Sequence, residues 1–202
     1  MLFRSGDDFR YGAQRAGDYA FLDAQGAELG FEVARMMSYE VHGLRVSSSA
    51  VRSALSAGDL AQARLLLGRP YVLSGRTIHG AKLGRELGFR TLNLRLPYHQ
   101  SAAMGIFVAR VQGLASQALP AVASLGVRPT VEDAGRLLLE VHCLDWPSTL
   151  GADGGYGKCV QVELTHKLHD ERKYDSLEAL KAGIAQDVED ARRWHGEHAQ
   201  RG

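Results

Sequence analysis

The chain has 202 residues, which allows one large domain or two small ones. Apolar residues make up 45% and charged residues 23%, values typical of a globular protein rather than a disordered or fibrous one. The 24 basic side chains nearly balance 23 acidic ones, so composition gives no support to nucleic acid as the main partner. Apolar stretches are too short to cross a membrane, and charged residues begin too early for a signal peptide. We therefore expect a cytoplasmic protein with neither a membrane nor a nucleic-acid partner.

The first third of the chain is predicted to be rich in helices. Residues 18–29 have the pattern of a helix with Asp18 as N-cap and Gly30 just beyond its end, and residues 31–39 look extended. A short helix is expected from Ser48 or Ser49 to Gly58, and a second one over residues 60–67 with Asp59 as N-cap.

After Pro70 the pattern changes to alternation of apolar and polar residues, which predicts strands. The expected strands span residues 71–78, 106–112, 121–125, 137–144 and 158–165. Five or more such strands indicate a small closed barrel, and from Ser176 the apolar period becomes helical. We place a domain boundary between residues 67 and 68, where a helix stop meets a strand start.

The two cysteines, Cys143 and Cys159, lie in strand-like runs without C-x-x-C spacing. We expect both to be buried thiols, with no disulfide framework and no metal site. The pairs His166/His169 and His195/His198 have a spacing seen in metal sites, but nothing completes either set, so surface histidines are the better interpretation.

A glycine-rich, charged segment separates two of the expected strands. It contains Gly80, Lys82, Gly84 and Arg85, and it matches neither a Walker A loop nor a dinucleotide fingerprint. Two interpretations stay open, an ordinary surface loop and a loop whose amides and cations hold phosphate.

Three further residues have both a structural and a functional interpretation. Thr91 and Asn93 are two apart and can share a face, so they either form a turn or offer neutral oxygens to a Mg²⁺ that also binds nucleotide phosphates. Glu140 is the one carboxylate in the apolar run 137–144, and it lies either on the solvent face of its strand or in a functional site.

The serines at the start of the expected helix that ends at Gly58 are explained by capping, since they lack the context of a hydrolase nucleophile. An anion could nevertheless bind at Ser48 and Ser49, with Arg52 one turn into the helix.

Taken together, these segments make the chain resemble the bifunctional bacterial riboflavin kinase/FAD synthetase family, truncated at its N-terminus. The resemblance covers nearly the whole chain and is carried by residues 8–12 (DFRYG), 46–52 (VSSSAVR), 67–71 (LGRPY), 79–80 (HG), 84–85 (GR), 87–89 (LGF), 125–130 (LGVRPT), 139–142 (LEVH) and 172–177 (RKYDSL).

For residues 68–202 the resemblance implies a riboflavin kinase domain, a six-stranded antiparallel barrel with a C-terminal helix. It implies transfer of the ATP γ-phosphoryl group to the riboflavin 5′-hydroxyl, with ATP, ADP, riboflavin and FMN as ligands. The family's catalytic glutamate falls on Glu140, and the family's metal and nucleotide motif falls on Thr91 and Asn93. The implied phosphate-binding residues are Gly80, Lys82, Gly84 and Arg85, and the implied flavin-binding residues are Arg172 and Tyr174.

Two features depart from the family pattern. In the metal motif, Arg90 stands for proline and Leu92 for alanine, which predicts a less preorganised loop. Residues 1–67 resemble only the C-terminal part of an α/β FMN adenylyltransferase domain. The H-x-G-H motif of that domain is absent, so Ser48, Ser49 and Arg52 are interpreted as a vestigial phosphate motif.

The alternatives are a non-catalytic flavin or nucleotide-binding remnant, a purely structural barrel, and FAD synthesis if the missing half is supplied. The sequence does not indicate an oligomeric state.

Overall fold

The computed structural model describes residues 1–202 except 7, 80–87, 98–99, 128–134, 152 and 199–202. Its contacts divide the chain into two compact units, residues 1–47 and residues 48–202.

The first unit is a small α/β structure in which strand β1 (Leu2–Gly6) pairs in parallel with β2 (Glu32–Met36). Between them runs helix α1 (Tyr19–Leu29), as predicted: the Phe21 amide donates to the Asp18 carboxylate at 2.9 Å, and Gly30 ends the helix in a left-handed conformation. The remaining elements are a 3-10 turn and a hairpin: Ala13–Arg15, β3 (Glu40–Val41) and β4 (Leu44–Arg45). A parallel strand pair joined by a helix is the pattern expected of part of an α/β domain.

The second unit begins with helices α2 (Ser48–Ala57) and α3 (Leu60–Leu67). The Asp59 carboxylate caps α3 by accepting from the Gln62 amide at 2.8 Å, and Gly68 ends it with φ of 67°. Both residues have the capping roles that the sequence predicts.

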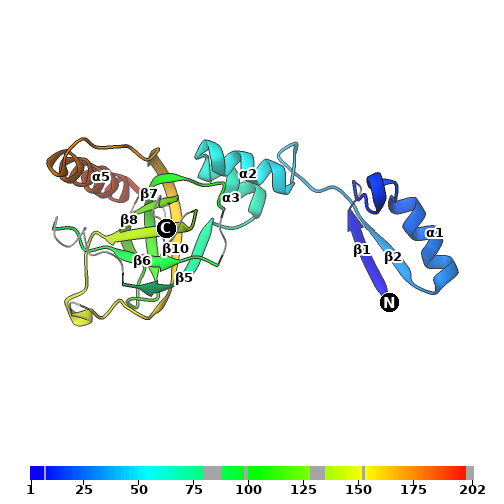
Figure 1. Ribbon diagram of the computed structural model, residues 1–202, viewed down its shortest axis with the longest axis horizontal. Helices are drawn as coiled ribbons and strands as arrows, with labels where there is room; N and C mark the ends of the chain where they lie inside the picture. Colours follow the sequence, from blue (N-terminus) through cyan, green and yellow to red (C-terminus); the bar gives the residue numbers. More distant parts are fainter. Residues whose placement is uncertain (7, 80–87, 98–99, 128–134, 152, 199–202) are drawn as a thin grey trace. The chain divides into compact units, whose positions relative to one another are not determined.

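Six antiparallel strands then close into a barrel in the order β10-β5-β6-β9-β8-β7, followed by one long helix (Figure 1). The elements are β5 (Val72–Ile78), β6 (Leu92–Arg95), β7 (Gly105–Gln112), β8 (Leu119–Val127), β9 (Leu137–Cys143), a 3-10 turn (Ser148–Leu150), β10 (Cys159–His169) and α5 (Leu177–His198). The predicted antiparallel barrel with its C-terminal helix is therefore confirmed.

Alternation along the strands separates the barrel interior from its outer face. The side chains that fill the interior are almost all below 3% exposed: Leu73, Leu92, Leu94, Phe107, Ala109, Val111, Ala121, Ala123, Leu125, Leu139, Val141, Val160, Val162 and Leu164. The interior is packed with apolar side chains, so polar residues that do chemistry have to lie on the outer face.

Helix α5 covers part of that outer face, over β7 and β8. Val108 and Val122 of the barrel pack with Ala191 and Val188 of the helix. Among the described helices, none combines the length and the apolar composition that a bilayer crossing requires.

The contacts divide the chain between residues 47 and 48, because α3 packs on β10 and so belongs to the compact unit that contains the barrel. The boundary between residues 67 and 68, which concerns the two family domains, stays a prediction. Two details differ from the sequence-based expectations. Strand β6 was not expected, since it has only four residues. Cys143 is buried as expected, and burial raises its pKa to about 12, but Cys159 is exposed at the start of β10.

The position of α3 predicts how shortened chains behave. A chain beginning at Ser48 should retain the barrel's unfolding free energy, whereas one beginning at Gly68 should lose about 3 kcal/mol, because Leu60 and Leu66 are buried in the unit that contains the barrel. Urea titrations of the two shortened chains measure this difference. Equal stability would show that α2 and α3 add nothing to the barrel.

Candidate active site

The strand register brings two of the predicted site residues side by side. Glu140 of β9 is the direct partner of Asn93 in β6 and of Ser124 in β8. Direct partners in an antiparallel sheet project to the same face, so the three side chains form a row on the outer face of the barrel. We call Asn93, Glu140 and Ser124 the polar row.

Asn93 holds a buried acceptor that the described part of the protein does not satisfy. Its side chain is only 4% exposed, and no hydrogen-bond partner is found for Oδ1 among the described residues. An unsatisfied buried polar atom costs about 1–3 kcal/mol, so such atoms are commonly completed by a ligand or ion. Thr91 lies two residues before Asn93 and is half-buried.

The residue before Thr91 is anchored through both its backbone and its side chain. His142 Nδ1 donates to the Arg90 carbonyl at 2.8 Å. The Arg90 guanidinium lies 4.9 Å from the centre of the Trp146 ring and donates to the Gly151 carbonyl at 3.2 Å. These contacts restrain the chain where the sequence led us to expect a looser loop.

A cavity of about 570 Å³ opens beside the polar row. Its walls are the outer face of the barrel, the segment after β10 and helix α5. The lining residues include Ile106, Ser124, Gly126, Leu138, Glu140, His169, Glu171, Arg172, Lys173, Tyr174, Leu180, Ile184 and Asp187. The structure thus places the predicted catalytic Glu140 and the predicted flavin-binding Arg172 and Tyr174 in one cavity.

Glu171 is a second carboxyl group near Glu140 that the sequence analysis missed. The Ser124 hydroxyl bonds to it, and its carboxylate lies so close above Gly126 that a Cβ at this position would collide with it. Partial burial raises the pKa of Glu171, the bond from Ser124 opposes that shift, and the charge of Glu140 adds to it. The glycine at position 126, two residues after Ser124 in β8, is the feature of the sequence that could have indicated this close approach.

Tyr174 packs on helix α5 at a position that only glycine permits. A Cβ on Gly183 would overlap the Tyr174 ring and hydroxyl. The absence of a side chain at Gly183 therefore helps to set where Tyr174 borders the cavity.

His169 is not the surface histidine that its spacing suggested. Its Nε2 bonds to the Asp187 carboxylate at 2.7 Å, and Nδ1 bonds to the Asp170 carbonyl at 2.7 Å. His195 is also partly buried, and its Nε2 bonds to the Ala109 carbonyl at 3.2 Å. Both contacts join distant parts of the chain, which spacing in the sequence cannot show.

Two further groups of predicted site residues remain. Gly80, Lys82, Gly84 and Arg85 lie outside the described residues. Ser48, Ser49 and Arg52 occupy the start of α2, where the Arg52 guanidinium donates to the Ser48 hydroxyl at 3.4 Å.

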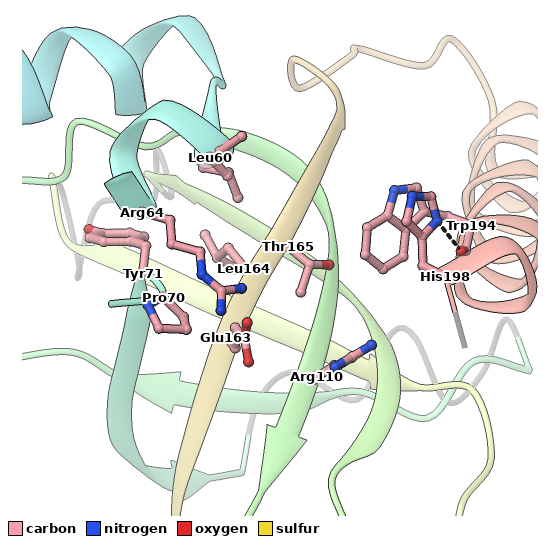
Figure 2. Close-up of a pocket in the computed structure, with 11 residues that line it drawn as sticks. Leu60, Arg64, Pro70, Tyr71, Arg110, Glu163, Leu164, Thr165, Trp194 and His198 are labelled. Atoms are coloured by element: carbon pink, nitrogen blue, oxygen red, sulfur yellow. Dashed lines mark hydrogen bonds between the residues drawn. The ribbon is translucent and has the colours of Figure 1, made fainter. Parts of the chain in front are cut away.

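A second hollow of about 260 Å³ lies on another part of the barrel surface (Figure 2). Arg64 of α3, Glu163 of β10 and Trp194 of α5 border it, and its lining includes no predicted site residue that the structure describes. The larger cavity beside the polar row is therefore the candidate active site.

Comparison with known proteins shows the family to which the chain belongs. Residues 67–195 match the family model described as "Flavokinase: Riboflavin kinase", and residues 3–50 match the model described as FAD synthetase. The chain belongs to the riboflavin kinase family. The first match contains the whole barrel and the cavity, which confirms the resemblance seen in the sequence.

Two bifunctional riboflavin kinase/FMN adenylyltransferases illustrate the family relationship. The protein from Escherichia coli K12 is 44% identical over 191 residues, which are 95% of this chain and 59% of that protein. The protein from Pseudomonas fluorescens is 43% identical over 187 residues, 93% of this chain and 58% of that protein. The chain thus spans less than two thirds of the length of these family members.

A solved structure gives the same result for the fold. A Streptococcus pneumoniae protein described as a macrolide-efflux protein has a TM-score of 0.68 and 28% identity, over 94% of this chain and 59% of that chain. This likeness concerns the architecture alone.

His142, which holds the Arg90 carbonyl, predicts a pH dependence of stability. Burial lowers the pKa of His142, the bond to Arg90 opposes that shift and the nearby Arg192 cation adds to it. The unfolded chain therefore binds protons more readily below about pH 6.5, and the unfolding free energy falls as the pH falls toward the lower folded-state pKa. Between pH 7 and pH 5, urea titrations should show a larger loss for the wild type than for His142→Gln. Equal losses would contradict this assignment.

Proposed function

We propose that the chain is a riboflavin kinase that transfers the γ-phosphoryl group of ATP to the riboflavin 5′-hydroxyl, giving FMN and ADP. The observation that carries the proposal is the pairing of Glu140 with Asn93 at the edge of a cavity lined by Arg172 and Tyr174. Membership of the riboflavin kinase family and the names of the bifunctional relatives support it.

Glu140 is proposed as the base that accepts the proton of the 5′-hydroxyl. It is half-buried at the centre of β9, so strands on both sides fix its position. A carboxylate held beside the hydroxyl removes its proton as the oxygen attacks the γ-phosphorus, and the leaving group is ADP.

Thr91 and Asn93 are proposed to hold the Mg²⁺ of Mg-ATP. The residues fit a hard cation because the Asn93 Oδ1 atom is buried and unsatisfied among the described residues, and Thr91 adds a hydroxyl oxygen. Two neutral protein ligands leave the remaining positions to phosphate and water oxygens, and the metal when bound neutralises phosphate charge. Gly80, Lys82, Gly84 and Arg85 are proposed as phosphate ligands from the sequence alone.

We do not extend the proposal to FAD synthesis by this chain. The FAD synthetase match covers only residues 3–50, and the 202 residues contain no H-x-G-H motif. Because its co-substrate ATP is an intracellular metabolite and its cysteines are free thiols, we also propose a cytoplasmic location.

The central test is FMN formation by the wild type and by Glu140→Gln. We expect the wild type to convert riboflavin to FMN with Mg-ATP, and the variant to lose about 10²- to 10⁴-fold in kcat, because an amide keeps the shape but cannot accept a proton. Chromatography that separates riboflavin, FMN and FAD measures this.

Glu163→Gln is the matched control, since Glu163 is also half-buried on the outer face of the barrel but borders the second hollow. It should keep the wild-type rate. Undiminished turnover by Glu140→Gln would refute the role of Glu140, and flavin binding without FMN would favour the non-catalytic alternative.

Arg90 predicts an effect on nucleotide affinity. Arg90→Ala removes the contacts to Trp146 and Gly151 while leaving the bond from His142 to the backbone. We expect the KM for Mg-ATP to rise several-fold with little change in kcat, because Thr91 is then less firmly held. An unchanged KM would show that the backbone bond alone positions the loop.

A further inference from the structure

Asp187 is a buried acid of helix α5 whose hydrogen bonding is only half completed. The residue is 8% exposed, and its Oδ1 accepts from His169 Nε2 at 2.7 Å. Among the described residues, no partner is found for Oδ2, although Asp187 borders the cavity. Arg172 and Lys173 border the same cavity, yet neither forms an ion pair with Asp187 within 4 Å.

His169 fixes the orientation of this carboxylate. Its two ring nitrogens bond to the Asp170 carbonyl and to Asp187, and a carbonyl and a carboxylate both accept. The ring is therefore held at both ends. This arrangement keeps Oδ1 engaged and leaves Oδ2 as the acceptor available to a ligand.

The register gives the spacing between His169, which bonds to Asp187, and Glu140 at the reacting end of the site. Glu140, Ser124, Ile106 and His169 are successive direct partners on β9, β8, β7 and β10. Three strand spacings separate Glu140 from His169, about 14 Å measured around the barrel and less in a straight line. This is comparable to the reach of extended riboflavin from its 5′-hydroxyl to the imide nitrogen of its ring.

The cavity wall near Asp187 suits a flat ring. Ile106 from the barrel and Leu180 and Ile184 from α5 are apolar members of the lining. A flavin ring offers apolar faces and one N–H donor, at N3 between two carbonyl groups. A carboxylate oxygen that reaches the cavity beside apolar side chains is a complementary acceptor for such a donor.

We propose that Asp187, positioned by His169, accepts a hydrogen bond from the N3–H group of the flavin ring. Asp187 is then a specificity-determining residue at the end of the substrate remote from the reacting hydroxyl. The inference rests on the proposed function, because it takes riboflavin as the ligand of this cavity.

The probe is 3-methylriboflavin, which lacks the N3 donor. Binding of riboflavin and of 3-methylriboflavin is measured by quenching of flavin fluorescence without nucleotide, so that no turnover is needed. We expect the wild type to bind riboflavin roughly 10- to 100-fold more tightly, because the methylated ring covers the Asp187 carboxylate without offering it a donor.

Asp187→Asn separates the hydrogen bond from a simple steric effect. Asparagine has nearly the same size as aspartate. If the preference for riboflavin over 3-methylriboflavin comes from crowding of the methyl group, it persists in the variant. If it depends on a carboxylate acceptor, it falls to a few-fold or less. The control is Asp190→Asn, an acid of the same helix that bonds to Gln186 and pairs with Arg193 outside the cavity. It should keep the wild-type ratio of the two affinities.

The outcomes separate this inference from the proposed function. Equal affinities in the wild type, or an unchanged ratio in Asp187→Asn, would overturn the role of Asp187 while leaving the kinase proposal intact. Failure of the wild type to bind riboflavin at all would overturn both. If Asp187→Asn does not fold, His169→Gln serves instead, because loss of one ring contact frees the carboxylate and should lower the ratio.

Discussion

The site depends on the register of β9 between β6 and β8. That register places Glu140 beside Asn93 on one side and Ser124 on the other. Because side chains alternate between the two faces of a strand, a shift of one residue would turn Glu140 into the apolar interior. The buried Leu139 and Val141, which flank Glu140 in sequence, make such a shift costly. The packing of the barrel interior is therefore what holds the polar row on its outer face.

The site also requires that helix α5 and the segment before it cover part of that outer face. Helix α5 packs on β7 and β8 through Val108, Val122 and Ala191 and so closes one side of the cavity. The segment between β10 and α5 is attached at several points, since His169 bonds to Asp187, Glu171 lies over Gly126, and Tyr174 packs on Gly183. Each attachment depends on the position of the barrel relative to the helix, which makes the shape of the cavity a property of the whole second unit.

Local signals in the sequence predicted most of the elements. Asp18, Asp59 and Gly68 act as expected because capping depends only on neighbouring residues. The family resemblance led to Glu140 and Asn93 separately, but their pairing depends on strand register, which no local pattern contains. The contact of His169 with Asp187 was missed for the same reason. The role of Arg90 was missed because its restraints come from Trp146 and Gly151, more than fifty residues away.

The most direct test of this account is a crystal structure with ADP, FMN and Mn²⁺, with the metal located by its anomalous scattering. The account predicts a metal peak within coordinating distance of Asn93 Oδ1 and the Thr91 hydroxyl, bridged to the nucleotide phosphates, with the FMN phosphate next to Glu140. A metal bound elsewhere, with Asn93 Oδ1 bonded to a protein group and Glu140 remote from the FMN phosphate, would contradict it.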